Sequence, residues 1–375
     1  MVETETQTLW STDAFKALFK DQNRFSKALI VLTKNMAVKR YQFLRIVLNL
    51  LNELNIATLI FDEFSSEITT KDLLKGAEIA RDFECDVIVG IGGAKTLDAA
   101  KLIALLAQNP VSEPIFESLS KKATALAIIA VPTTIQVKSA YRDLALFIDP
   151  IEERITTIKQ ATLRPQYSLI LPEVIESLPR DLIILHALEI FYTSSEIYLL
   201  EGRDEAAIQT IIERVHEVLK SILNSTDVID VRGLLEASQA LAQIQKEITP
   251  LEAFEQAFLL LHSTIPYGAA QSICALSYYR KFALSSTYTE RMAKLGMFLH
   301  VDAKGYDYPE QAQAFVNYLS ELLTSLQMRS LDLTNYGVDS AAISDYVHYT
   351  QTILGENLPL SEEELYDLLE ESLTS

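Results

Sequence analysis

Apolar residues occur as short unbroken runs in the first 150 residues, and these runs alternate with stretches of helical spacing. The apolar runs are at 28–33, 57–61, 86–90, 125–131 and 145–148, and the helical stretches are at 41–54, 71–83 and 95–106. Strands that alternate with helices of this length are typical of parallel βαβ units. Apolar runs without alternation indicate a sheet that is covered on both faces. The pattern predicts an α/β domain built on a parallel sheet.

The pattern changes after residue 165, where Pro165 and Pro172 mark a connector and helical periodicity then dominates. The helical stretches are at 182–200, 204–224, 231–246, 251–262, 269–282, 288–298, 309–326 and 361–373. Four leucines on one face of the last stretch predict an amphipathic helix that covers the domain, rather than a partner-binding tail. We predict an α/β domain at 1–165 and an all-helical domain at 166–375.

Composition and charge restrict the partners of the protein. Among 375 residues, 32 Lys and Arg stand against 51 Asp and Glu, for a net charge of −19. Such a surface repels phosphate backbones, so we expect no nucleic-acid partner. The N-terminus is acidic rather than basic, and no apolar run approaches the roughly 18 residues of a membrane span. We therefore expect no membrane association. Because Cys85 and Cys274 belong to no paired motif, we also expect free thiols and a reducing, cytoplasmic location.

A glycine-rich turn connects the third apolar run to the next helical stretch. The strand residues run into Gly90, Gly92 and Gly93 and then directly into a helix. Glycines allow a sharp turn and a close approach of backbone N–H groups, and the helix N-terminus carries positive partial charge. The residues alone leave two readings open, a tight structural turn and a pyrophosphate site.

The turn resembles the G-G-G-x-x-x-D motif of the iron-containing alcohol dehydrogenase and glycerol dehydrogenase superfamily, which includes dehydroquinate synthase. Gly92 and Gly93 match the first two glycines, Ala94 replaces the third, and Asp98 matches the aspartate. Lys101 matches the lysine that usually follows. The resemblance implies that this turn binds the pyrophosphate of NAD or NADP.

Other segments resemble the family in the same order. Ala130–Thr134 is similar to its P-T-T segment, Leu178-Pro179 to its connector, Ile265–Gly268 to its P-H-G, and Asn357–Glu363 to its C-terminal motif. The resemblance implies a dehydroquinate synthase-like fold. The residues that it assigns to the cofactor are Gly92, Gly93, Ala94, Lys95, Asp98, Thr133, Thr134, Thr33 and Lys34.

The metal ligands that the family implies are mostly missing. Family members hold a divalent metal that polarises the substrate oxygen. In the alignment Glu189 stands in the Asp position, Thr193 where a His is expected, and Tyr267 in place of the P-H-G histidine. Residues 250–253, where the remaining His should lie, contain none. We therefore expect no tightly bound Zn²⁺ or Fe²⁺, since one carboxylate does not hold such an ion tightly.

A relocated metal site from His186, Glu189 and His262 is the less favoured alternative, because these residues could equally be ordinary helix residues. His186 and Glu189 have the spacing that places two side chains on one helix face. The remaining histidines show no ligand-like spacing, and we interpret them as structural; they are His216, His300 and His348.

Basic residues occupy two places where the family has other side chains. Thr33-Lys34, followed by Lys39 and Arg40, replaces the acid that often binds the adenosine ribose. This exchange would favour a 2′-phosphate, and hence NADP, although lysines after a strand are often only solvated. After the P-T-T segment, Lys138 and Arg142 could meet an anionic substrate, could replace the metal as a fixed charge, or could lie on a solvated hairpin.

Three functions remain open at this level. The first is a dinucleotide-dependent oxidoreductase that acts on a small alcohol, polyol or hydroxy acid, with Lys138, Tyr267 or Asp98 handling the hydroxyl proton. The second is a non-catalytic homologue that keeps a nucleotide site. The third, suggested by Glu189 and the basic pair, is a cyclase resembling dehydroquinate synthase. A small-molecule substrate is expected in the enzymatic cases, and a homo-oligomer is compatible with all three.

Overall fold

The computed structural model describes residues 5–20, 24–34, 41–64, 68–110, 123–149, 154–176, 178–224, 229–262, 264–328, 337–338, 340–355 and 359–374. The chain divides into two compact units, 1–178 and 179–375. This division falls later than the predicted boundary at 165, because residues 167–169 add a strand to the sheet of the first unit.

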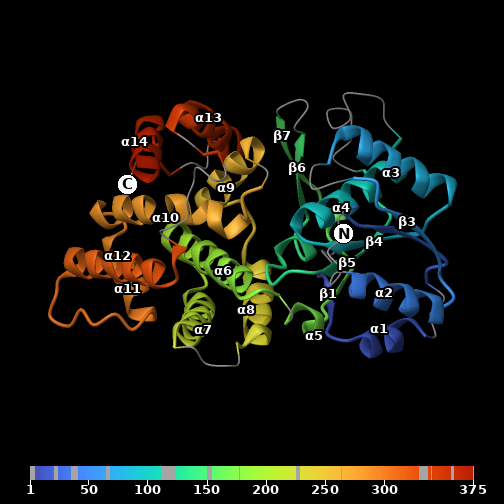
Figure 1. Ribbon diagram of the computed structural model, residues 1–375, viewed down its shortest axis with the longest axis horizontal. Coiled ribbons are helices and arrows are strands. Elements are labelled where there is room, and N and C mark those ends of the chain that lie inside the picture. Colours follow the sequence, from blue (N-terminus) through green and yellow to red (C-terminus); the bar gives the residue numbers. More distant parts are fainter. Residues whose placement is uncertain are drawn as a thin grey trace. The chain divides into compact units, whose positions relative to one another are not determined.

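The α/β unit is built on a six-stranded parallel sheet with the order β1-β8-β5-β4-β2-β3. Its strands are β1 (Gln7–Leu9), β2 (Lys27–Val31), β3 (Ala57–Phe61), β4 (Val87–Gly92), β5 (Ala127–Pro132) and β8 (Tyr167–Leu169). Helices α1 (Thr12–Phe19) and α2 (Tyr41–Glu53) cover one face, while α3 (Thr70–Asp82) and α4 (Ala94–Gln108) cover the other (Figure 1). The predicted parallel sheet is confirmed.

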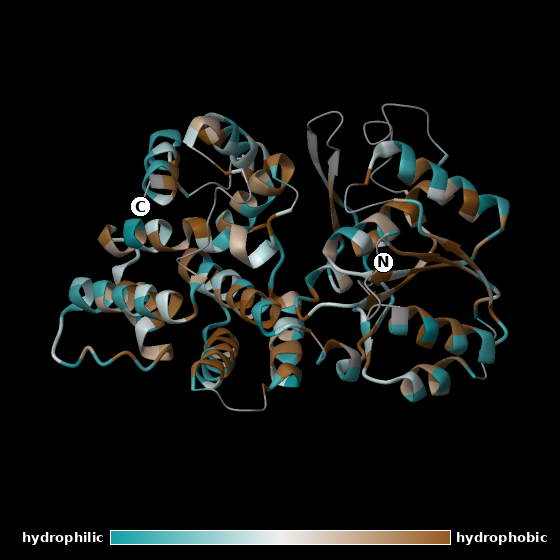
Figure 2. Ribbon diagram, viewed as in Figure 1, coloured by the Kyte–Doolittle hydropathy of each residue, from teal (hydrophilic) through white to brown (hydrophobic). Residues whose placement is uncertain are grey.

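Burial on both faces explains why the central strands lack polar alternation. Every residue of β4 is buried, and the sheet strands are among the most apolar segments of the unit (Figure 2). Helix α4 is buried along nearly its whole length, from Thr96 to Ala107. Both cysteines are free and buried, as the sequence predicted for the thiols.

Some elements of this unit were not predicted. The apolar run at 145–148 does form a strand, β6 (Leu144–Asp149), but it pairs antiparallel with β7 (Arg154–Lys159) in a separate two-stranded sheet. Strands β1 and β8 have three residues each, too few to show a periodicity. The shorter elements are η1 (Lys138–Ala140), η2 (Ala161–Leu163) and α5 (Pro172–Ile175).

The second unit is entirely helical in the part of the chain that the structure describes. Its elements are α6 (Arg180–Glu201), α7 (Glu205–Leu223), α8 (Val231–Ile244), α9 (Pro250–Leu261), α10 (Tyr267–Leu284), α11 (Thr289–Phe298), α12 (Tyr308–Ser325), η5 (Ser340–Ala342), α13 (Ile343–Leu354) and α14 (Glu362–Thr374). Helix α13 was not predicted. Leu365, Leu368 and Leu369 of α14 are buried, which confirms its amphipathic character. Residues 357 and 358 of the C-terminal motif lie outside the described residues.

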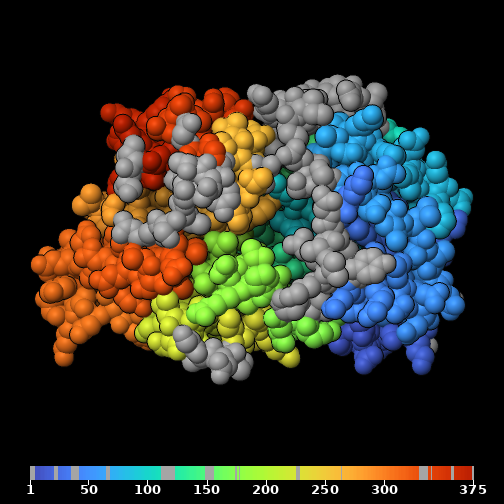
Figure 3. Space-filling view, in the orientation of Figure 1, coloured from blue at the N-terminus to red at the C-terminus, as the bar shows by residue number. Residues whose placement is uncertain are grey.

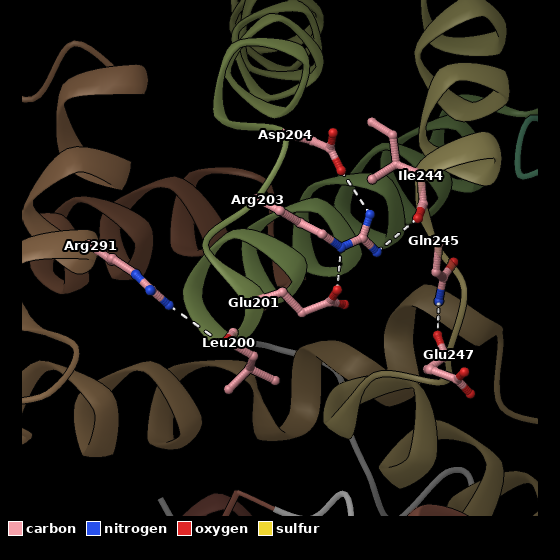
Figure 4. A network of polar contacts seen from close by, with 8 residues as sticks. All are labelled: Leu200, Glu201, Arg203, Asp204, Ile244, Gln245, Glu247 and Arg291. Carbon is pink, nitrogen blue, oxygen red and sulfur yellow. Dashed lines mark hydrogen bonds and ion pairs between the residues drawn. The ribbon is translucent and has the colours of Figure 1, made fainter.

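Helix α6 is the central helix of this unit. It is long and apolar enough to cross a membrane, yet 89% of its most apolar window is buried inside the protein, as is usual for a core helix. It ends at Gly202, whose φ of +63° is the left-handed conformation that favours glycine at a helix end. The next residue, Arg203, donates hydrogen bonds to Glu201, to Asp204 at 2.7 Å and to the Ile244 carbonyl at 2.9 Å (Figure 4). This network ties the end of α6 to α8.

The core of the helical unit contains an uncharged carboxyl group as well as apolar side chains. Glu196 of α6 is fully buried, and its Oε1 accepts a hydrogen bond from the Leu251 amide of α9 at 2.8 Å. Burial, with a smaller contribution from the nearby Glu252, raises the pKa of Glu196 to about 8. At neutral pH the Glu196 side chain is therefore mainly protonated.

Helices α11 and α12 contribute to the outer surface of the helical unit (Figure 3).

Glu196 predicts a pH dependence of stability. The folded protein holds a proton on Glu196, whereas the unfolded chain releases it above the ordinary pKa near 4.5. The free energy of unfolding therefore falls as the pH rises from about 4.5 toward about 8. Glu196→Gln keeps the acceptor for Leu251 but cannot ionise. Its stability relative to the natural protein should therefore grow by roughly 1.4 kcal/mol per pH unit across this window. Urea unfolding at several pH values measures the difference.

The exposed variant Glu217→Gln is the matched control, because Glu217 lies on the surface of the neighbouring helix α7. It should follow the natural protein at every pH. A constant difference between Glu196→Gln and the natural protein across the window would contradict the assignment of a raised pKa to Glu196.

Candidate active site

The predicted cofactor residues lie at the carboxyl edge of the sheet, where the strand order reverses. The connection from β2 leads to β3 on one side and the connection from β4 leads to β5 on the other, so the strand order reverses between β2 and β4. In parallel α/β sheets, ligands bind at such a switch point, outside the carboxyl ends of the strands. Thr33 and Lys34 follow β2, Gly92 and Gly93 end β4, and the Thr133 amide donates to the Gly92 carbonyl at 3.0 Å.

Close packing requires glycine at two positions of the turn, 90 and 92, but not at position 93. A Cβ on Gly90 would lie 2.8 Å from the Ala100 Cβ, and one on Gly92 would lie 2.5 Å from the Thr96 Cβ, so both let α4 pack closely on β4. Gly93 differs, since a Cβ there would meet only the Thr134 methyl at 3.6 Å. Its φ of −80° is open to any residue. Neither packing nor backbone conformation requires glycine at 93, which leaves room for a ligand above it.

Two further features of the turn fit a pyrophosphate. The Thr133 hydroxyl is buried and has no hydrogen-bond partner among the described residues. Gly93 is the N-cap of α4, and no side chain caps this helix end, so its first-turn N–H groups and positive partial charge face outward at Ala94 and Lys95. Thr134 donates to the Gln136 carbonyl at 3.0 Å, which fixes the segment beside the turn. The residues present therefore fit a dinucleotide.

The basic residues after β2 are only partly described. The Lys34 amide donates to the Phe64 carbonyl at 2.8 Å, so the chain is held at this point while the Lys34 side chain is exposed. Lys39 and Arg40 lie outside the described residues.

Asp98 and Lys101 form a buried clamp on helix α4. The Lys101 ammonium donates to Asp98 at 2.9 Å and to the Leu144 carbonyl at 2.7 Å, and the Leu146 amide donates to the other Asp98 oxygen at 3.2 Å. Complete burial lowers the pKa of Lys101, while Asp98 opposes the change. Both carboxylate oxygens of Asp98 are thus engaged in holding β6 against α4, a positioning task rather than proton transfer.

Lys138 and Arg142 are buried, which excludes the alternative that they lie on a solvated hairpin. Lys138 begins the short helix η1 and is 4% exposed, and Arg142 is 6% exposed. The segment packs against α4 and β5, which removes it from solvent. Two buried basic residues thus lie four and eight residues after Thr134 in the chain.

In the helical unit, the structure brings together two of the three residues of the alternative metal site. His186 Nδ1 and Glu189 Oε2 lie 3.6 Å apart on one face of α6. His262 instead shares a hydrogen bond of 2.7 Å with the Tyr346 hydroxyl. Within the described residues, no group of three or more His, Cys, Asp or Glu side chains is placed to hold a metal ion.

Two positions at which the family resemblance implies histidine ligands hold other residue types. Thr193 is fully buried in α6, one turn after Glu189, and Tyr267 is the half-buried first residue of α10. A threonine hydroxyl and a phenol are poor ligands for Zn²⁺ or Fe²⁺. These residues do not fit the divalent metal of the family.

The remaining histidines include one unexpected pair. The rings of His216 and His300 lie 6.4 Å apart, and His216 shares a hydrogen bond of 2.5 Å with the Tyr318 hydroxyl. Burial lowers the pKa of His216 to about 4, so it is neutral and structural. Gln271 of α10, which is fully buried and whose amide has no hydrogen-bond partner among the described residues, was not predicted from the sequence. A glutamine inside an apolar helix was the only signal that could have identified it.

Comparisons with known proteins agree with this architecture. Residues 6–172 match the family model described as iron-containing alcohol dehydrogenase. An NADPH-dependent butanol dehydrogenase of Clostridium saccharobutylicum is 25% identical over 332 residues, which cover 83% of this chain and 81% of that protein. Alcohol dehydrogenase 4 of Schizosaccharomyces pombe is 24% identical over 295 residues, 75% of this chain and 66% of that protein.

Solved structures share the fold at lower identity. An archaeal alcohol dehydrogenase from a Red Sea brine pool superimposes over 98% of this chain and 97% of its own, with a TM-score of 0.82 and 20% identity. An NADH-dependent butanol dehydrogenase of Thermotoga maritima covers 99% of this chain and 98% of its own, with a TM-score of 0.79 and 17% identity. The α/β unit thus matches the model of the iron-containing alcohol dehydrogenase family, and the chain as a whole has the fold of solved alcohol dehydrogenases.

Proposed function

We propose that the protein is an NAD(P)-dependent oxidoreductase for a small alcohol, polyol or hydroxy acid, and that it works without the divalent metal of its family. The observation that carries the proposal is the glycine turn, where open space above Gly93, an unpartnered Thr133 hydroxyl and an uncapped helix end converge. The bound nicotinamide would accept or supply the hydride. The activity for which one relative is named, a butanol dehydrogenase, supports an alcohol as substrate.

In this proposal a buried cation replaces the metal. An alcohol that loses hydride must also lose its hydroxyl proton, and the developing negative charge needs stabilisation. Lys138 is the candidate for that fixed positive charge, because it is buried five residues after Thr133. Tyr267 remains a second candidate for proton handling, whereas Asp98 is committed to Lys101 and β6.

NADP is the favoured dinucleotide. The end of β2 carries Thr33 and Lys34 and no acid, so it offers a positive charge to a 2′-phosphate and no carboxylate to a ribose diol. The relative from Clostridium saccharobutylicum is NADPH-dependent. A cytoplasmic location and a homo-oligomeric state remain predictions from the sequence.

A non-catalytic protein that binds a nucleotide is the second candidate. The missing metal ligands at positions 193 and 267 favour it, while the glycine turn is compatible with both functions. Turnover of alcohols or aldehydes by the purified protein with NADPH distinguishes the two.

The first prediction from the proposed function concerns Gly93. Gly93→Val should abolish binding of NADPH and NADH, because its side chain would fill the space above the turn, while the melting temperature changes little because that space is open. Calorimetric titration of the purified variant measures the affinity. Gly90→Val is the matched control, and it should unfold the α/β unit, since its side chain would meet Ala100 and Leu97. Undiminished affinity in Gly93→Val would exclude this cofactor site.

The second prediction concerns the choice of dinucleotide. Lys34→Asp should weaken NADPH binding by about tenfold, since one exposed charge pair contributes on the order of 1 kcal/mol, and should leave NADH binding unchanged or improved. Fluorescence titration with both reduced dinucleotides gives the ratio. Lys20→Asp, which changes the same charge at an exposed position after α1, should not alter the ratio. Equal effects of Lys34→Asp on both dinucleotides would contradict this role.

The third prediction concerns metal content. The purified protein should contain no stoichiometric Zn or Fe, and a chelator should leave its melting temperature unchanged, because no metal-binding free energy is linked to the native state. Elemental analysis measures the content. About one equivalent of tightly bound metal per chain would refute the metal-free proposal and direct attention to His186 and Glu189.

A further inference from the structure

Strand β3 is the outermost strand at one end of the six-stranded sheet, and its free edge differs from the edge at the other end. The strand lies between helices α2 and α3, which cover opposite faces of the sheet (Figure 1). The edge strand at the other end, β1, has only three residues, and shortness is one way in which proteins prevent an edge from pairing with another chain. Strand β3 has five residues and contains no charged residue, Pro or Gly. It therefore lacks the protection that shortness, charge or proline gives to an edge.

The main chain of β3 offers hydrogen-bonding groups along this free edge. The Ala57 amide donates to the Ser26 carbonyl at 2.8 Å, so Ala57 directs its main-chain groups toward β2. The same holds at Phe61, whose carbonyl accepts a hydrogen bond of 3.1 Å from the residue that follows β2. Because main-chain groups alternate in direction along a strand, Thr58 and Ile60 direct theirs away from the sheet. Among the described residues β3 pairs only with β2, so these outward groups are available to a further strand.

Two apolar side chains are exposed at the same edge, one on each face of the sheet. Leu59 is 38% exposed and Ile60 is 42% exposed, which is unusual for large apolar residues within a strand. A Cβ on Gly76 of α3 would lie 3.0 Å from the Phe61 ring, so Phe61 faces α3. Side chains alternate between faces, so Leu59 also lies on the α3 face and Ile60 on the α2 face. A strand that paired with β3 would cover both side chains.

The charges of α3 favour a second copy of the chain as the partner. Two basic residues are exposed in the first half of this helix and two acidic residues in its second half; they are Lys71, Lys75, Glu78 and Asp82. Its other charged residues are engaged within the chain, Asp72 in the N-terminal capping box and Arg81 with a carbonyl of α4 at 3.1 Å. Lys75 also pairs with Glu63. A twofold axis makes two α3 helices antiparallel, so the basic half of one lies beside the acidic half of the other.

We propose that β3 is a self-association edge, at which two copies of the chain pair antiparallel about a twofold axis through Leu59. Complete overlap of the strand with its copy selects this register, because Leu59 is the middle residue of Ala57–Phe61. Thr58 then exchanges main-chain hydrogen bonds with Ile60 of the partner subunit, and Leu59 faces Leu59 of the partner subunit. The sheets of the two copies become one continuous sheet.

This register also keeps like charges apart. Asp62, the first residue after β3, would lie opposite Ile56 of the partner subunit, which is uncharged. Like charges directly opposite each other would be destabilising. The inference does not rest on the proposed function, because β3 contains none of the residues assigned to the cofactor or to the reaction.

Cross-linking tests the register directly. Leu59→Cys places two thiols at the axis, where opposed Cα atoms lie about 4.5 Å apart, which is within the range of a disulfide. The purified full-length variant, oxidised with copper phenanthroline, should form a covalent dimer on non-reducing electrophoresis. The natural protein gives the background, because its own two cysteines are buried. Met297→Cys is the matched control: Met297 is 54% exposed but lies in the helical unit, so this variant should cross-link about tenfold more slowly.

Two further changes in the Leu59→Cys protein separate strand pairing from chance collision. Ile60→Lys adds the charge that protects natural edge strands, and Thr58→Pro removes only an N–H that points away from β2. Each should slow cross-linking by about tenfold. The melting temperature of Ile60→Lys should change little, since the side chain is already exposed. If one of the two proteins fails to fold, the other still gives the comparison.

Three results would overturn the inference. They are cross-linking of Leu59→Cys no faster than that of Met297→Cys, an unchanged rate in the folded Ile60→Lys and Thr58→Pro proteins, and sedimentation of the natural protein as a monomer at the concentration used for cross-linking. A covalent Leu59→Cys dimer whose formation is slowed by both edge substitutions is the result that the inference predicts.

Discussion

The close approach of helix α4 to strand β4 is the constraint on which the α/β unit depends. It is possible because Gly90 and Gly92 have no Cβ to meet Ala100 and Thr96. The same approach places the uncapped start of α4 at the carboxyl edge of the sheet, where the strand order reverses. It also carries Lys101 and Asp98 to β6, which their buried hydrogen bonds hold in place. One packing requirement thus positions both the glycine turn and the segment that follows it.

The helical unit shows a different balance, in which polar groups are kept in a core at the expense of stability. Glu196 is buried in its protonated form, and Thr193 and Gln271 are buried without described partners. Proteins tolerate such groups where function requires them, because stability beyond what function needs is not selected. The core of these helices is therefore not purely apolar, and Thr193 places a hydroxyl at a position where the family resemblance implies a histidine.

Much of the fold could be predicted from the sequence, because long buried strands and amphipathic helices have a clear periodicity. The three-residue strands at 7–9 and 167–169 could not, since their pairing is decided by distant residues such as Ile129 and Ala130. The turn at Gly92 and the pair His186–Glu189 followed from local spacing. The burial of Lys138 and the unpartnered state of Gln271 did not, because both depend on tertiary packing around an otherwise unremarkable segment.

The central claim is a dinucleotide site without a metal site, and a crystal structure of the protein grown with NADPH and Zn²⁺ tests it most directly. Anomalous data at the zinc edge would locate any bound metal. The account predicts pyrophosphate density against Gly92, Gly93 and Ala94 and no anomalous peak beside Glu189. A zinc peak coordinated by Glu189, or a dinucleotide bound away from the glycine turn, would contradict it.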